Sequence, residues 1–126
     1  MRYSILFVED DPMLAEVYEH ALMNAGFDVV LASSGQEVVT ILEKSKIDLV
    51  LLDMILPNES GLMILQKIKI EYPDTAVAMF TNLTAVQERE AAFDLGAIGF
   101  LEKSQYTPRE LALEVERLCE TECQKK

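Results

Sequence analysis

The chain has 126 residues, a length that fits one domain and allows about two-thirds of the unfolded surface to be buried. Its 22 acidic and 11 basic residues give a formal net charge of -11, which disfavours nucleic acid and anionic membrane surfaces because both would repel it. The sequence has neither an apolar run of membrane-spanning length nor a signal-peptide pattern. We therefore expect a cytoplasmic protein whose partners are other proteins or cations.

Five short apolar runs without polar alternation are typical of strands covered on both faces of a parallel sheet. They cover residues 4–8, 28–32, 48–52, 76–80 and 98–101. Segments with helical spacing of apolar residues follow them at 12–24, 34–44, 60–71, 84–95 and 108 to about 119. Five successive βα units predict an α/β fold, a doubly wound five-stranded parallel sheet with five helices and right-handed crossovers.

Three of the predicted helices after the first have start signals. Glu37 stands three residues after Ser34, the spacing of a capping box. Thr84 is the candidate cap of the fourth helix. Thr107 is followed by Pro108, a cap with proline at the first helical position.

Ligands of open parallel sheets bind beyond the carboxyl ends of the strands. The residues found there are Glu9, Asp10, Asp53, Thr81 and Lys103. If the first and third strands are neighbours, the three carboxylates converge, and two carboxylates about 4 Å apart repel by roughly 4 kcal/mol at an effective dielectric near 20. Cations are therefore needed. Lys103 supplies one charge, and a hard divalent cation, best Mg²⁺, supplies the other.

A carboxylate beside a metal ion and a lysine, with a hydroxyl such as that of Thr81 opposite, is arranged to accept a phosphoryl group. Asp53 is the candidate nucleophile, which would form an acyl phosphate, because it stands alone after its strand. Glu9 and Asp10 form a pair suited to holding metal. Asp11, followed by proline, is interpreted as a helix N-cap, with a metal-ligand role as the less favoured alternative.

Together these motifs resemble the receiver domain of two-component response regulators, over nearly the whole chain. The matching residues are the acidic pair Glu9-Asp10, Asp53 in LLDMILPNESG with Pro57 and Gly61 at the expected offsets, Thr81 in MFTN, and Lys103 in GFLEK. The resemblance implies a flavodoxin-like sheet with strand order 2-1-3-4-5. We expect the receiver domain at residues 1–122 and a solvated tail at 123–126.

The resemblance also implies a phosphorelay function. Asp53 would take a phosphoryl group from a histidine kinase or a histidine phosphotransfer protein. Asp10 would bind Mg²⁺ directly and Glu9 largely through water, while Asp53 and the backbone carbonyl of Ile55 complete the protein ligands. The domain would catalyse its own phosphorylation and dephosphorylation without turning over a small-molecule substrate.

A conformational switch is part of the same resemblance. Thr81 would be drawn toward the phosphoryl group, and Phe100, three positions before Lys103, would turn into the space that Thr81 leaves. The surface of the fourth helix, fifth strand and fifth helix would then change its affinity for a downstream effector protein. A monomer and a phosphorylation-dependent dimer both remain open.

Four positions depart from the family pattern. Ser104 follows Lys103 where the family usually has proline after a cis bond, and since a cis bond before a non-proline residue costs about 2.5–4 kcal/mol, we predict a trans bond and a rearranged loop at 104–105. Asn82 stands where a small residue is usual, and its side chain would either crowd the phosphoryl entrance or hydrogen-bond the group. Ile55 and Leu83 are apolar where many relatives are polar, which predicts slow loss of phosphate because neither orients attacking water.

Two other functions remain as alternatives. The Asn82 and Ser104 departures permit a phosphorylation-independent interaction module on the same fold. A hydrolase of the haloacid dehalogenase kind needs a second aspartate two residues after its nucleophile, and Ile55 occupies that place. Cys119 and Cys123 are expected to be free thiols, since no second pair completes a zinc site.

Overall fold

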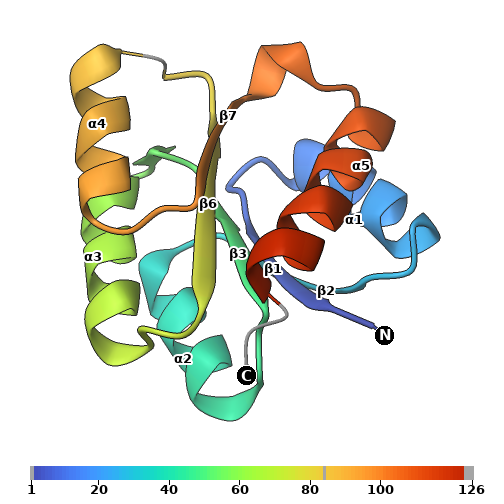
Figure 1. Ribbon diagram of the computed structural model, residues 1–126, viewed down its shortest axis with the longest axis horizontal. Helices are drawn as coiled ribbons and strands as arrows, with labels where there is room; N and C mark the ends of the chain where they lie inside the picture. Colours follow the sequence, from blue (N-terminus) through green and yellow to red (C-terminus); the bar gives the residue numbers. More distant parts are fainter. Residues whose placement is uncertain (1, 84, 124–126) are drawn as a thin grey trace.

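The computed structural model describes residues 2–83 and 85–123. Its main sheet has five parallel strands in the order β2-β1-β3-β6-β7 (Figure 1). These strands are β1 (Ser4–Val8), β2 (Asp28–Ala32), β3 (Leu49–Leu52), β6 (Ala76–Thr81) and β7 (Gly99–Glu102). Counted among the five predicted strands, this is the order 2-1-3-4-5, which confirms the predicted sheet.

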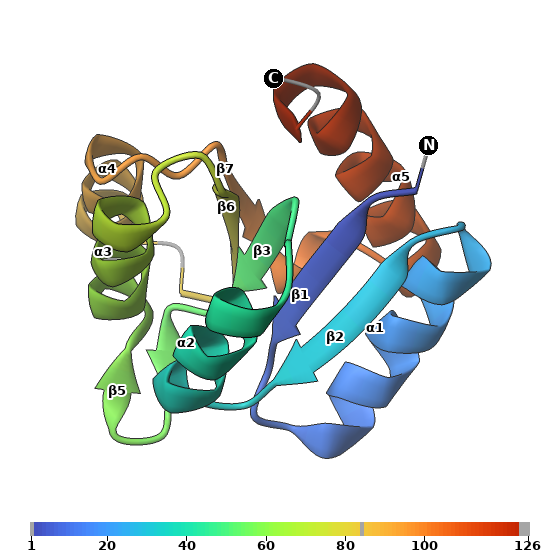
Figure 2. The same ribbon diagram turned by 90° about the horizontal axis from the view of Figure 1, so that it is seen from below.

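Five helices cover the two faces of this sheet. They are α1 (Pro12–Asn24), α2 (Gly35–Lys44), α3 (Gly61–Glu71), α4 (Val86–Asp94) and α5 (Pro108–Leu118). Figures 1 and 2 show α1 and α5 on one face and α2, α3 and α4 on the other. Within the described ranges, none of the helices has the length and apolar character needed to cross a membrane.

The central strands explain the apolar runs of the sequence. Ile5 and Phe7 of β1 belong to the core under α1 and α5, and Leu6 and Val8 belong to the core under α2, α3 and α4. Successive side chains of a strand point to opposite faces, and here both faces are covered by helices. A strand of this kind has no solvent face, so its sequence shows no polar alternation.

The helix starts follow most of the predicted signals. Asp11 Oδ1 accepts the N–H groups of Met13 at 3.0 Å and Leu14 at 3.4 Å, which confirms it as the α1 cap. At α5 both halves of a capping box are present, between Thr107 and Glu110.

The capping box predicted at α2 is half correct. Ser34 Oγ accepts the N–H of Glu37 at 3.2 Å. The Glu37 carboxylate, however, accepts the backbone N–H of Ser33 at 2.7 Å and also its hydroxyl at 3.1 Å. Ser33 offers two donors to one carboxylate oxygen, and the reciprocal bond therefore falls one residue before the cap.

The fourth helix begins later than predicted. α4 starts at Val86, and Ala85 at its N-cap makes no side-chain capping bond. Thr84, the predicted cap, lies outside the described residues. Ala92 is the one buried residue of α4, so this helix is attached to the sheet by a narrow contact.

Three short elements were not predicted. A short hairpin follows β3 and has two residues in each strand, β4 (Ile55–Leu56) and β5 (Glu59–Ser60). A 3-10 turn, η1 (Lys103–Gln105), follows β7, and a π-helical turn, η2 (Cys119–Cys123), extends α5. Cys123 Sγ donates to the carbonyl of Asp48 at 3.4 Å. The packed chain thus reaches Cys123, and residues 124–126 lie outside the described part.

Candidate functional site

One pocket at the carboxyl edge of the sheet collects the residues predicted from the strand ends. Of the predicted site residues, all except Phe100 line this pocket: Glu9, Asp10, Asp53, Ile55, Thr81 and Lys103. The other lining residues are Asp11, Leu14, Asn82 and Leu83. The register explains this meeting, because Val8 at the end of β1 pairs with Leu52 at the end of β3. Glu9 and Asp53 follow at the same height of the sheet.

Lys103 connects two carboxylates in this pocket. Its Nζ lies 2.5 Å from Oε1 of Glu9 and 2.8 Å from Oδ2 of Asp53, and 5.9 Å from the centroid of the Phe80 ring. Burial by itself lowers the pKa of Lys103, but the hydrogen bonds and charges of Asp53 and Glu9 outweigh it and raise the pKa above its ordinary value. The ammonium therefore stays charged at neutral pH.

The two carboxylates are also held by backbone groups. Oε2 of Glu9 accepts the N–H of Asp11 at 3.1 Å, and Oδ1 of Asp53 accepts the N–H of Ile55 at 3.1 Å. Their side chains are only 3% and 11% exposed. Each carboxylate is thus oriented by one ammonium and one amide, which is the fixed geometry that a reacting group requires.

Asp10 has a different environment from its neighbours. It is exposed, lines the same pocket, and forms neither a hydrogen bond nor an ion pair with any residue in the ranges 2–83 and 85–123. An unpaired carboxylate at the mouth of an acidic pocket is free to bind a cation.

The donor set fits Mg²⁺ better than a metal that requires a complete protein cage. No three His, Cys, Asp or Glu side chains within the described ranges come together as a metal-holding group. Mg²⁺ keeps several waters and takes one or two carboxylates. Asp10, Asp53 and the carbonyl of Ile55 would suffice for it as direct ligands. Glu9, whose two oxygens are bonded to Lys103 and to the N–H of Asp11, would then act through water.

Thr81 also lines the pocket, together with Asn82 and Leu83, which follow it directly. Thr81 is 1% exposed, and its Oγ1 accepts the N–H of Leu83 at 3.1 Å. Asn82 Oδ1 accepts the N–H of Ser104 at 3.1 Å. Residues 2–83 and 85–123 contain no cis peptide bond, so the trans bond predicted at Ser104 is confirmed and the rearranged loop is the turn η1.

Phe100 is placed outside the pocket, on β7. It is half-buried against the core of α2, α3 and α4. The guanidinium of Arg89 on α4 lies 6.0 Å from the ring centroids of both Phe100 and Phe93. Sequence reasoning missed Arg89, although its spacing of four residues from Phe93 on a helix was a usable signal.

Gly61 explains the spacing of the motif around Asp53. A Cβ at this position would lie 2.1 Å from the carbonyl oxygen of Asp53, and the N–H of Gly61 donates to Met54 O at 2.8 Å. The hairpin β4–β5 therefore folds back directly onto the backbone of the residue that follows β3. Only glycine permits this close approach.

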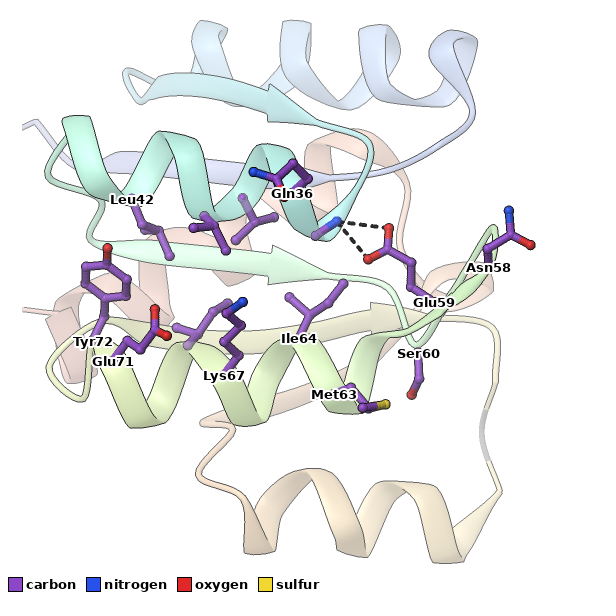
Figure 3. A pocket seen from close by; sticks show the side chains of 14 residues that line it. Gln36, Leu42, Asn58, Glu59, Ser60, Met63, Ile64, Lys67, Glu71 and Tyr72 are labelled. Carbon is purple, nitrogen blue, oxygen red and sulfur yellow. Dashed lines mark hydrogen bonds between the residues drawn. The ribbon is translucent and has the colours of Figure 1, made fainter.

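A second groove lies between α2 and α3 and shares no lining residue with the first pocket. Figure 3 shows Glu59 of the hairpin reaching the start of α2, where its two carboxylate oxygens each accept the N–H of Gly35 at 3.0 Å. Met63, Ile64 and Tyr72 line the groove from the α3 side. The bonds between Glu59 and Gly35 tie the hairpin to the start of α2.

The fold and the acidic residues, threonine and lysine at its carboxyl edge define a signal-receiving domain of the flavodoxin-like α/β class. The sequence model of the protein family described as the response regulator receiver domain matches residues 5–116 of this chain. The chain belongs to this family, whose members act in two-component systems.

Individual relatives agree with this assignment. The chain is 33% identical over 100 residues to the probable transcriptional regulatory protein TcrX of Mycobacterium tuberculosis, covering 79% of this chain and 43% of that protein. It is 31% identical over 115 residues to the DNA-binding response regulator MtrA of Mycolicibacterium smegmatis, covering 91% of this chain and 50% of the relative. The chain thus spans half or less of the length of these two relatives.

Solved structures show the same architecture. The signal receiver domain of a LuxO repressor protein from Vibrio parahaemolyticus superimposes with a TM-score of 0.87 at 28% identity, over 96% of this chain and 92% of that one. A CheY-like receiver domain protein from Methanospirillum hungatei has a TM-score of 0.89 at 23% identity, over 97% of both chains. At that identity the second match supports the fold alone.

Proposed function

We propose that Asp53 accepts a phosphoryl group from the phosphohistidine of a histidine kinase or histidine phosphotransfer protein. The observation that carries this proposal is the Lys103 ammonium, 2.8 Å from Asp53 Oδ2, in a pocket that Thr81 and Asp10 also line. Family membership supports the class of reaction, and the proposal assigns its steps to particular residues.

In the transfer, an oxygen of Asp53 forms a bond to phosphorus while the N–P bond of the phosphohistidine breaks and its electron pair returns to the imidazole. Lys103 neutralises charge on the transferring oxygens, and the Thr81 hydroxyl donates a hydrogen bond to one of them. Asp10, Asp53 and the Ile55 carbonyl would hold Mg²⁺, which supplies further positive charge when bound. Glu9 keeps Lys103 in place.

The output of the domain is a protein-binding surface. When Thr81 moves toward the phosphoryl group, Phe100 turns inward, and the surface of α4, β7 and α5 changes for a downstream effector or a second copy of the chain. A structure with a phosphoryl analogue such as beryllofluoride tests this switch. If Thr81 and Phe100 keep their present positions in that complex, the switch proposal is wrong.

Acetyl phosphate with Mg²⁺ tests the phosphoacceptor role directly. Intact mass spectrometry of the wild type should show one added phosphate, and Asp53→Asn should show none. Asp10→Ala should lose the Mg²⁺-dependent reaction while remaining folded. A panel of histidine kinases, tried in the same assay, then identifies the donor.

An unmodified wild type in that assay would contradict the proposal. It would favour the alternative function, a phosphorylation-independent interaction module in which Lys103 permanently neutralises Glu9 and Asp53. Pull-downs with wild type and Asp53→Asn distinguish the two functions, because such a module binds its partners equally well in both forms.

A further inference from the structure

Asn82 and Ser104 follow directly after the pocket residues Thr81 and Lys103, and a hydrogen bond joins them. Oδ1 of Asn82 accepts the backbone N–H of Ser104 at 3.1 Å, across 22 residues of chain. Asn82 lies just beyond β6, and Ser104 lies in the turn η1 that follows β7. The bond therefore ties together the two loops that carry Thr81 and Lys103.

The backbone N–H of Ser104 needs an acceptor from outside its own turn. In a 3-10 turn the first N–H groups have no partner within the turn, and η1 is closed by the bond from Tyr106 N to Lys103 O at 3.3 Å. The Ser104 hydroxyl donates to Oε2 of Glu102 at 2.9 Å. The side chain of Ser104 is thus bonded to Glu102, the last residue of β7, and its N–H is held by Asn82.

Holding this N–H restricts Lys103. The N–H of Ser104 belongs to the peptide unit that also contains the Cα and carbonyl of Lys103, and a peptide unit is planar. Fixing the N–H therefore fixes the position of the Lys103 Cα, and because Glu102 before it belongs to β7, the backbone of Lys103 is constrained on both sides. The ammonium at the far end of the Lys103 side chain must meet Glu9 at 2.5 Å and Asp53 at 2.8 Å simultaneously, which leaves little tolerance for rotation of the turn.

We propose that Asn82 is a positioning residue that aims Lys103 at Asp53 by anchoring the peptide between Lys103 and Ser104. The effect of Asn82 on phosphorylation rests on the proposed acceptor role of Asp53. Its effect on the Lys103 ammonium does not, and can be measured in the unphosphorylated protein.

Four variants test the proposal. Asn82→Ala removes the acceptor. Ser104→Ala is the matched control, because it removes the hydroxyl bond to Glu102 and leaves the N–H in place. Ser104→Pro removes the N–H itself, and the double variant Asn82→Ala/Ser104→Pro completes the cycle. Circular dichroism melting verifies that each variant is folded.

The first measurement is NMR on the unphosphorylated protein. Asn82→Ala should accelerate amide hydrogen exchange at Ser104 and shift or broaden the ¹⁵Nζ signal of Lys103, whereas Ser104→Ala should change neither. Unchanged exchange and an unchanged Lys103 signal in Asn82→Ala would overturn the proposal. This outcome is independent of whether Asp53 takes up phosphate.

The second measurement is the initial rate of phosphorylation by acetyl phosphate. Losing one hydrogen bond corresponds to a change of about two- to tenfold, so Asn82→Ala should slow the wild type by that factor and Ser104→Ala should not. In the Ser104→Pro background the effect of Asn82→Ala should disappear.

If Asn82→Ala slows both backgrounds equally, its side chain acts on the phosphoryl group directly and the positioning role is wrong. A wild type that takes up no phosphate would refute the proposed function and leave the NMR result to decide this inference.

Discussion

Three consecutive carboxylates at the end of β1 have three different environments. Glu9 is buried and paired with Lys103, Asp10 is exposed without a described partner, and Asp11 caps α1 through two backbone N–H groups. The difference follows from the geometry at the strand end. Successive side chains diverge there, so that one enters the pocket, the next lines its mouth and the third meets the helix start.

Replacing the second and third of these carboxylates should separate function from stability. Asp11→Ala removes the α1 cap and should lower the free energy of unfolding by about 1 kcal/mol while phosphorylation persists. Asp10→Ala removes an exposed carboxylate without a described partner and should leave the stability within about 0.5 kcal/mol of the wild type, while Mg²⁺-dependent phosphorylation is lost. Urea denaturation and the acetyl phosphate assay measure the two effects. The same stability loss in both variants would contradict the division of roles.

Among the elements, β4 and the loop after β6 each place an apolar side chain at the pocket. Ile55 is 60% exposed at the pocket and Leu83 is half-buried beside it. Neither side chain can orient a water molecule for attack on an acyl phosphate. We therefore expect a phosphoryl group on Asp53 to be lost slowly.

Replacing Ile55 and Leu83 by polar residues should shorten the lifetime of the phosphorylated domain. Ile55→Asn with Leu83→Gln should accelerate loss of phosphate by about three- to tenfold, because an oriented water reacts faster than a free one. The decay of the phosphorylated mass after removal of acetyl phosphate measures the rate. Ile70→Asn is the control, since Ile70 on α3 is 72% exposed and does not line this pocket. Unchanged decay in the double variant would show that water access is governed elsewhere.

Arg89 of α4 contacts the Phe100 ring of β7 across the gap between the two elements. A cation–π contact at an exposed site contributes about 0.5–1 kcal/mol, so Arg89→Ala should raise the population of an inward-turned Phe100 by about two- to fivefold. NMR shifts of the Phe100 ring, with the beryllofluoride complex as the end point, measure this population. Glu90→Ala, on an exposed neighbour in α4, should leave the ring unchanged. An identical shift in both variants would assign the effect to α4 as a whole.

The sequence predicted the elements whose signals are long and repeated, and it missed those that depend on a few residues. The apolar runs define the sheet most clearly in β3 and β6, where every residue is buried, because burial on both faces disfavours polar residues. The hairpin β4–β5 has only two residues in each strand, too few for any periodicity to appear.

The same limit applies to the site. The apolar runs predict where each strand ends. The residues just after those ends include Glu9, Asp53, Thr81 and Lys103, which lie in one pocket. The hydrogen bond between Asn82 and Ser104 joins two loops through one side chain and one backbone amide. No spacing of residues along the sequence predicts such a contact.

At the scale of the whole molecule, Lys103 links three strands of the sheet. It follows β7, an edge strand, and its side chain reaches the ends of β1 and β3. In a chain with a net charge of -11, this ammonium offsets two carboxylates that would otherwise repel each other inside the pocket. Its charge therefore contributes to the stability of the fold as well as to the proposed chemistry.

This contribution should have a defined pH dependence. Lys103→Met leaves Glu9 and Asp53 without their ammonium and should lower the free energy of unfolding by about 3 kcal/mol at pH 7, as for other broken buried pairs. Because the pKa of Lys103 is raised in the folded state, its stabilising effect is complete below the ordinary lysine pKa of about 10.4 and is lost as the pH rises through the folded-state pKa. The difference between wild type and variant should stay constant from pH 7 to about 10 and shrink above it.

Urea unfolding in the presence of a chelator measures this difference, and Lys67→Met, on an exposed lysine of α3, should show none. A difference that already falls between pH 7 and 9 would mean that the Lys103 ammonium is not held by the two carboxylates.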